Sequence, residues 1–86
     1  MKINDTVSLM QSEDYKERFI AEYVQTKARY EKLHRTIVKE DAGTLGFDLT
    51  CNVALLREQA SYMGHYLYVL EVRAEKEGIE LPSVEV

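Results

Sequence analysis

The stretch from Tyr15 to Ala42 contains neither glycine nor proline, and this constrains the fold more than any other feature of the chain. Within it, large and mostly apolar residues recur at helical steps of three and four. They are Phe19, Tyr23, Tyr30, Leu33 and Ile37, with Thr26 as the one polar member. The pattern predicts a single amphipathic helix of about 28 residues, roughly 42 Å long at 1.5 Å per residue.

The ends of this helix have sequence signals of their own. Ser12, followed by two acidic residues, predicts a helix start with Ser12 as the cap and a helix over about 13–42. Gly43 is the expected left-handed stop, and residues 43–51 form the connecting loop. In that loop Leu45, Phe47 and Leu49 alternate with other residues, and we expect them to fold back over the end of the helices.

A second long helix follows the loop. Thr50 or Cys51 is expected to open it, so that it spans about 52–77 and ends at Gly78. Its inner seam follows alternating steps of four and three. The seam consists of Leu56, Ala60, Met63, Leu67, Leu70 and Ala74. Packed on the first helix, it predicts an all-α fold, a hairpin of two long antiparallel helices over residues 12–81.

The segments outside the hairpin carry weaker patterns. Residues 1–11 form an N-terminal arm whose apolar residues fit a short helix or an extended segment equally well. Ile79 and Leu81 are placed to cap the hairpin, and residues 82–86 are expected to be a frayed tail.

The second helix has more apolar surface than one partner helix can cover. A second line, one residue back from the seam, is also largely apolar. It consists of Leu55, Gln59, Tyr62, Tyr66, Val69 and Arg73. A hairpin this short rarely buries enough apolar area to offset the conformational entropy lost on folding. We therefore expect self-association into a symmetric homo-oligomer. Ala60 and Gly64, a small-residue pair in this helix, are interpreted as a helix crossing point.

Composition excludes several classes of function. The net charge of −4 and the isoelectric point near 5.1 argue against binding to DNA or to an anionic membrane. The sequence has no long apolar span, and one cysteine cannot form an internal disulfide, so we expect a soluble protein of the cytoplasm. The two histidines lie apart from any suitable nucleophile or metal-ligand cluster, so we expect no enzyme, no cofactor and no metal.

Two cationic residues and one tyrosine are the first candidates for ligand binding. Lys27 lies in a polar notch between apolar residues of the first helix, where it either meets a phosphate or pairs with Glu31. Arg73 either pairs with Glu77 or, in a trimer, converges with its copies on an anion. Tyr15, beside the free N–H groups of the first turn, is placed to contact a ligand.

Four segments of the sequence resemble a family of small phage-encoded helical-hairpin proteins. The segments are 33–39 (LHRTIVK), 42–47 (AGTLGF), 55–59 (LLREQ) and 63–79 (MGHYLYVLEVRAEKEGI). The family includes anti-CBASS and anti-Thoeris sponges, which bind the cyclic nucleotide messengers of bacterial immunity. The resemblance implies a symmetric hexamer with ligand pockets at subunit junctions, acting in the host cytoplasm during infection.

The same resemblance implies roles for individual residues. Residues 27–33 are similar to the sponge stretch whose lysine contacts a cyclic dinucleotide, which implies that role for Lys27. Tyr15 is similar to a sponge tyrosine, and Arg73 to an arginine that binds a cyclic trinucleotide. Tyr66 and Val69, on the line of Arg73, complete the expected ligand-binding set.

The function implied is sequestration of a cyclic di- or trinucleotide, or of a cyclic ADP-ribose-type signal, at subunit interfaces. The alternative is a phage protein that binds and modulates a host protein through the apolar face of its second helix, without a small ligand. A bare oligomeric scaffold is a third possibility.

Overall fold

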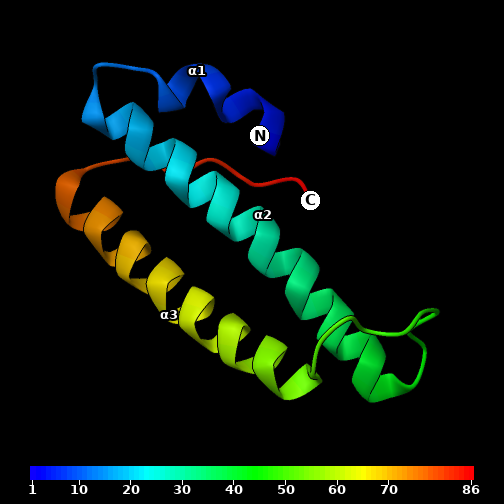
Figure 1. Ribbon diagram of the computed structural model, residues 1–86. Coiled ribbons are helices and arrows are strands. Elements are labelled where there is room, and N and C mark those ends of the chain that lie inside the picture. Colours follow the sequence, from blue (N-terminus) through cyan, green and yellow to red (C-terminus); the bar gives the residue numbers. More distant parts are fainter.

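The computed structural model describes residues 1–86, and helices are its only regular secondary structure, without strands. A 3-10 turn, η1 (Ile3–Thr6), leads into the short helix α1 (Val7–Met10), and two long helices follow, α2 (Tyr15–Ala42) and α3 (Val53–Glu77). Helices α2 and α3 run antiparallel and side by side, which confirms the predicted hairpin (Figure 1). For the N-terminal arm the sequence fitted a short helix and an extended segment equally well, and the structure shows that the arm is helical.

Helix α2 begins slightly later than the sequence predicted. Asp14 is the cap, because its carboxylate accepts a 2.9 Å hydrogen bond from the N–H of Lys16. The Ser12 hydroxyl lies outside the helix, where it accepts from the N–H of Asp14 and donates to Glu17 at 2.7 Å. At the other end Gly43 adopts the left-handed conformation, with φ of 73°, and ends the helix as predicted.

Helix α3 also begins later than predicted. Asn52, and neither Thr50 nor Cys51, is the cap, because its side-chain oxygen accepts from the N–H of Ala54 at 2.8 Å. The expectation for the loop was wrong in part, since Phe47 is 63% exposed although Leu45 and Leu49 are half-buried. Gly78 ends α3 in the left-handed conformation, and Ile79 beyond it is buried in the core.

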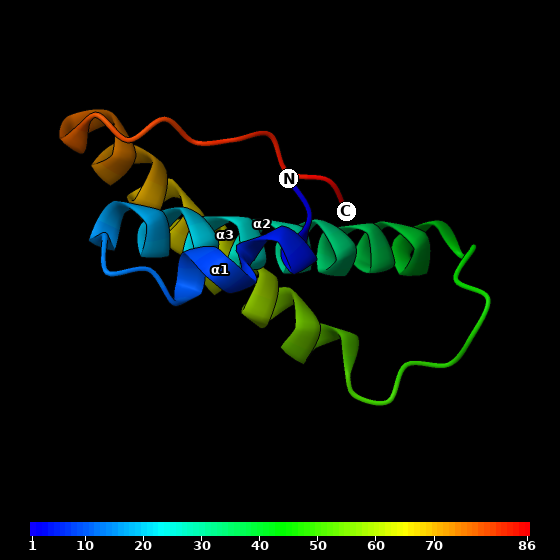
Figure 2. The same cartoon turned by 90° about the horizontal axis from the view of Figure 1, so that it is seen from above.

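The core is concentrated in one half of the hairpin. Its buried members come from the first half of α2, the second half of α3 and the residue that follows Gly78. They are Phe19, Tyr23, Val24, Leu67, Leu70, Ala74 and Ile79. The remaining seam residues, Leu56, Ala60 and Met63, are only half-buried. Figure 2 shows the reason, since α3 crosses α2 at an angle and diverges from it toward the loop.

The N-terminal segment packs on another face of α2. η1 and α1 both contact this helix, and Ala21 and Ala28 are buried on it. The Gln25 side-chain amide of α2 donates to the hydroxyl of Thr6 at 2.9 Å, and Thr6 donates to the carbonyl of Ile3. Thr6 is 1% exposed, so both hydrogen bonds offset the cost of burying its hydroxyl. One long helix is thereby covered by α3 and by the chain's own beginning.

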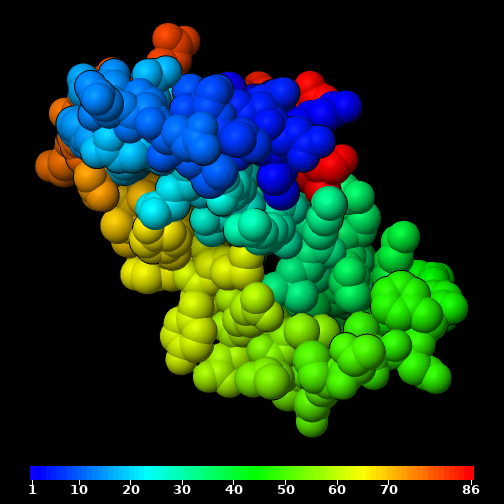
Figure 3. All heavy atoms as spheres, turned by 45° about the horizontal axis from the view of Figure 1, so that its top comes forward, coloured from blue at the N-terminus to red at the C-terminus, as the bar shows by residue number.

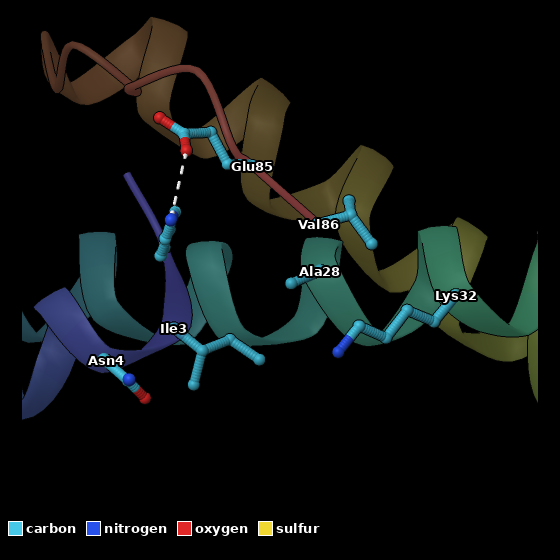
Figure 4. A pocket seen from close by; sticks show the side chains of 7 residues that line it. Ile3, Asn4, Ala28, Lys32, Glu85 and Val86 are labelled. Carbon is cyan, nitrogen blue, oxygen red and sulfur yellow. Dashed lines mark ion pairs between the residues drawn. The ribbon is translucent and has the colours of Figure 1, made fainter.

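The last residues do not fray as predicted. The amino group of Met1 donates to the carbonyl of Ser83, and the N–H of Glu85 donates to the carbonyl of Met1 at 2.9 Å. Figure 4 shows where the two ends of the chain meet beside Ala28 in the middle of α2, with the ion pair of Lys2 and Glu85 above the helix. Val84 packs against the core, because the extended segment crosses apolar surface that α3 leaves open. The two ends of the chain therefore hold each other on α2.

Gly64 provides a close approach between the two long helices. A Cβ atom added to it would lie 3.3 Å from the Cε1 atom of the Tyr30 ring. The predicted crossing point thus has a physical basis within one chain. The neighbour that Gly64 admits is an aromatic side chain, not the backbone of a second helix.

Candidate functional site

Tyr15, Arg73 and Glu77 form a cluster where α2 begins and α3 ends. The antiparallel arrangement brings these helix ends together, although the residues lie far apart in sequence. The phenol of Tyr15 donates a short hydrogen bond to Glu77, and the Nε of Arg73 donates to the same carboxylate at 3.1 Å. The guanidinium also lies 4.9 Å from the centre of the Phe19 ring, a cation–π contact. Two predicted ligand-binding residues therefore share one carboxylate.

The shared carboxylate shifts the pKa values of the Tyr15 and Glu77 side chains. The hydrogen bond to Glu77 raises the pKa of the Tyr15 phenol. The hydrogen bonds from Tyr15 and then Arg73 lower the pKa of Glu77. Both pKa shifts lead away from neutral pH, where a phenol is neutral and a carboxylate ionised in any case. The Arg73 side chain is 50% exposed, so its cation faces solvent while it is held in place.

Tyr66 and Val69 lie on the same side of the hairpin as this cluster. The phenol of Tyr66 donates to Glu22 of α2, and this hydrogen bond raises the pKa of Tyr66. Arg73 lies two helical turns further along the same face of α3, and its positive charge lowers the pKa of Tyr66. Both Tyr66 and Val69 are exposed. We call the surface made by Tyr15, Tyr66, Val69 and Arg73, together with the Glu77 and Glu22 carboxylates that they contact, the arginine flank.

Lys27 lies on a different side of the hairpin from the arginine flank. It is five residues from Glu22 on α2, which is about 140° around the helix axis. Its ammonium pairs with Glu31 at 3.2 Å, which is the ordinary surface pair weighed against a phosphate role. Burial alone would lower the pKa of Lys27, but the hydrogen bond to Glu31 and the negative charges of Glu31 and Glu71 raise it overall. Tyr23 donates to Glu71 nearby at 3.2 Å. One chain therefore does not bring Lys27 to the arginine flank.

Sequence reasoning missed two carboxylates of the arginine flank. Glu77 entered only as an alternative partner of Arg73, and Glu22 did not enter at all. The four-residue spacing to Arg73 was a usable signal for Glu77. Nothing in the sequence pointed to Glu22, because its contact with Tyr66 joins two helices.

The outer face of α3 is apolar and uncovered within one chain. Tyr62 is 69% exposed and Leu55 58% exposed, and a shallow hollow of about 450 Å³ lies between their side chains and Met63. Tyr68 and Val72 are exposed as well. The sequence-based expectation of a second apolar face without a partner in its own chain is confirmed at Leu55 and Tyr62. Further along the same line, Tyr66 and Arg73 contact side chains of α2.

The remaining His, Cys and acidic side chains do not come together in a further site. The structure assembles no group of three His, Cys, Asp or Glu side chains that could hold a metal ion. Cys51 is exposed and unpaired in the loop. None of the helices combines the length and the apolar character that crossing a membrane requires.

The structure defines a small all-helical hairpin with clustered tyrosyl and cationic side chains on an open surface. Its particular family follows from comparison with known families. The chain belongs to the Sequestin family, whose model matches residues 13–76, from just before α2 to the last turn of α3. Comparison with curated proteins and with solved structures finds no match.

The family assignment confirms the resemblance found in the sequence. A family named for sequestration fits the sponges of cyclic nucleotides that the sequence resembles. It supports a protein that binds and sequesters small signalling molecules rather than one that transforms them.

Proposed function

We propose that this protein is a phage counter-defence protein that sequesters a cyclic oligonucleotide, or a cyclic ADP-ribose-type signal, at interfaces between copies of the chain. The observation that carries the proposal is the arginine flank, which groups a solvent-facing guanidinium with two tyrosines on the chain of a Sequestin family member. Guanidinium groups bind phosphates, and phenol rings pack on bases and ribose. The mechanism is stoichiometric, since each bound messenger is removed from the free pool.

The arginine flank is open to an anion although it contains two carboxylates. The pair of Arg73 with Glu77 is exposed, and exposed pairs contribute little to stability because water and salt screen the charges. A phosphate offers the guanidinium two acceptor oxygens and can displace Glu77. Until then Glu77 and the Phe19 ring hold the guanidinium in position. The same reasoning applies to Lys27, whose only ion pair is with Glu31.

Self-association supplies what one chain lacks. The outer face of α3 leaves tyrosyl and aliphatic side chains in water, and burying them between copies is favourable at about 25 cal/mol per Å². Lys27 and the arginine flank lie on different sides of the hairpin, so a pocket closed around either one draws its remaining walls from other copies. We propose a hexamer, with Lys27 in one type of pocket and three copies of Arg73 in another.

Thermal denaturation with a panel of ligands tests the proposal. The panel contains cyclic di- and trinucleotides and cyclic ADP-ribose, and a true ligand raises the melting temperature by mass action. Lys27→Ala and Arg73→Ala should lose this shift while native mass spectrometry still finds the assembly. Lys39→Ala is the matched control, because Lys39 is an exposed cation of α2 outside both surfaces. No shift with any ligand at millimolar concentration would contradict the proposal.

The exposed apolar hollow between Leu55 and Tyr62 favours one alternative, in which α3 binds a host protein without a small ligand. Capture from host lysate separates the two. A sponge should recover no stoichiometric polypeptide, whereas a host-protein modulator should recover one that is lost in a Tyr62→Glu variant.

A further inference from the structure

A groove of about 320 Å³ lies between α2 and α3 in the half of the hairpin nearest the loop. It is far from the Tyr15 and Arg73 cluster, and none of its residues belongs to the proposed messenger sites. Ile37, Val38 and Ala60 give it an apolar lining, Tyr30 and His34 form an aromatic wall, and an ion pair lies at its rim.

The groove follows from the uneven packing of the hairpin. The helices diverge here, and the space-filling view in Figure 3 shows a gap between them that is absent near the core. Ala60 is too small to fill the space, and Val38 is 50% exposed beside it. An apolar lining that the chain leaves open to water is typical of ligand pockets, and this volume is at their lower end.

The two rings of the aromatic wall stack on one another. The rings of Tyr30 and His34 lie nearly parallel, at 10° to one another, with their centres 6.0 Å apart. Tyr30 is fixed against Gly64, whereas His34 is exposed. A planar heterocycle can therefore extend this stack on the exposed His34 ring without any rearrangement of the core.

The ion pair at the rim has unused hydrogen-bonding capacity. Arg57 contacts one carboxylate oxygen of Asp41 through a single terminal nitrogen. The second oxygen of Asp41 remains an acceptor, and the guanidinium retains most of its five N–H donors. Adjacent donors and acceptors complement the edge of a purine base, where arginine pairs with ring nitrogens and carbonyls and a carboxylate accepts from N–H groups.

We propose that this groove binds the purine base of a nucleotide, stacked on the aromatic wall and held at its edge by Asp41 and Arg57. The site is complete within one chain. It therefore differs from the messenger pockets of the proposed function, which need several copies, and it does not depend on them.

Titration of the isotope-labelled protein with guanosine and adenosine 5′-monophosphates, followed by backbone amide NMR, tests the proposal. Ribose 5-phosphate is the probe that lacks a base. We expect saturable shifts at groove residues with both nucleotides and none with ribose 5-phosphate. Equal shifts with ribose 5-phosphate, or shifts confined to the arginine flank, would overturn the proposal.

Matched variants on the rim and on the helix surface complete the test. Arg57→Gln and His34→Ala should each weaken nucleotide binding at least about tenfold, a loss comparable to that of one good base contact. Both side chains are exposed, so circular dichroism should show an unchanged fold. Arg35→Gln, an exposed cation next to His34 that does not line the groove, should bind normally. Normal binding by Arg57→Gln would refute the site.

Discussion

Truncation of two leucines on the same seam of α3 tests whether the hairpin is stabilised mainly from one half. Leu70 is 1% exposed within the core, whereas Leu56 is half-buried where the helices diverge. Leu70→Ala removes three carbons from a packed site and should cost about 3–4 kcal/mol, because the surrounding helices cannot close the cavity fully. Leu56→Ala should cost only about 1 kcal/mol, since part of its surface is already in water.

These costs are large against the stability of the whole chain. At about 0.05–0.15 kcal/mol per residue, 86 residues give roughly 4–13 kcal/mol. Leu70→Ala is therefore expected to remove a large part of the free energy of unfolding, and Leu56→Ala a small part. Urea denaturation followed by circular dichroism measures both, with Leu67→Ala and Met63→Ala as a second pair of the same design.

Self-association affects the measurement and is controlled by concentration. Each denaturation is repeated over a range of protein concentrations, because the midpoint of an oligomer rises with concentration and that of a monomer does not. The comparison is made between variants at equal concentration. Equal losses for Leu70→Ala and Leu56→Ala, or a greater loss for Leu56→Ala, would refute an unevenly packed hairpin.

Three further predictions concern single groups. The raised pKa of Tyr66 stabilises the fold below pH 10.0. Above pH 10.0 this stabilisation should decline, because the phenol ionises first in the unfolded chain. The urea midpoint of Tyr66→Phe should therefore decline less steeply with rising pH than that of the unchanged protein. The lowered pKa of Glu77 stabilises the fold above pH 4.5, and this is lost as the pH falls below that value, so Glu77→Gln should flatten the acid side of the stability profile. Gly64→Ala should leave the melting temperature nearly unchanged, because about 1 kcal/mol of helix propensity offsets displacement of the Tyr30 ring, whereas Gly64→Leu should lower it.

The two long helices and their stops were predictable from the sequence because their signals are local. Spacing of three and four residues places apolar side chains on one face, and Gly43 and Gly78 supply the left-handed conformation that ends a helix. The helix starts were less predictable. Several residues near each start have side chains that can cap, and the sequence alone does not show which one reaches the free N–H groups.

The candidate residues were recognisable by type, but their grouping was not. Tyr15 and Arg73 were identified from the positions they hold near helix ends and from resemblance. The carboxylate that joins them, Glu77, and the contact of Tyr66 with Glu22 depend on how two helices are rotated against one another. Lys27 was identified from helical periodicity as well, yet the fold places it on a different side of the hairpin.

The sequence by itself determined that this chain makes two long helices, that α3 has apolar residues on more than one face, and that the chain resembles the hairpin family. Only the tertiary structure decided that the core lies in one half and that the chain's two ends hold each other. It also decided that a groove opens beside Tyr30. The physical reason is that helical periodicity is set by neighbours along the chain, whereas the crossing angle is set by the fit of side chains between helices.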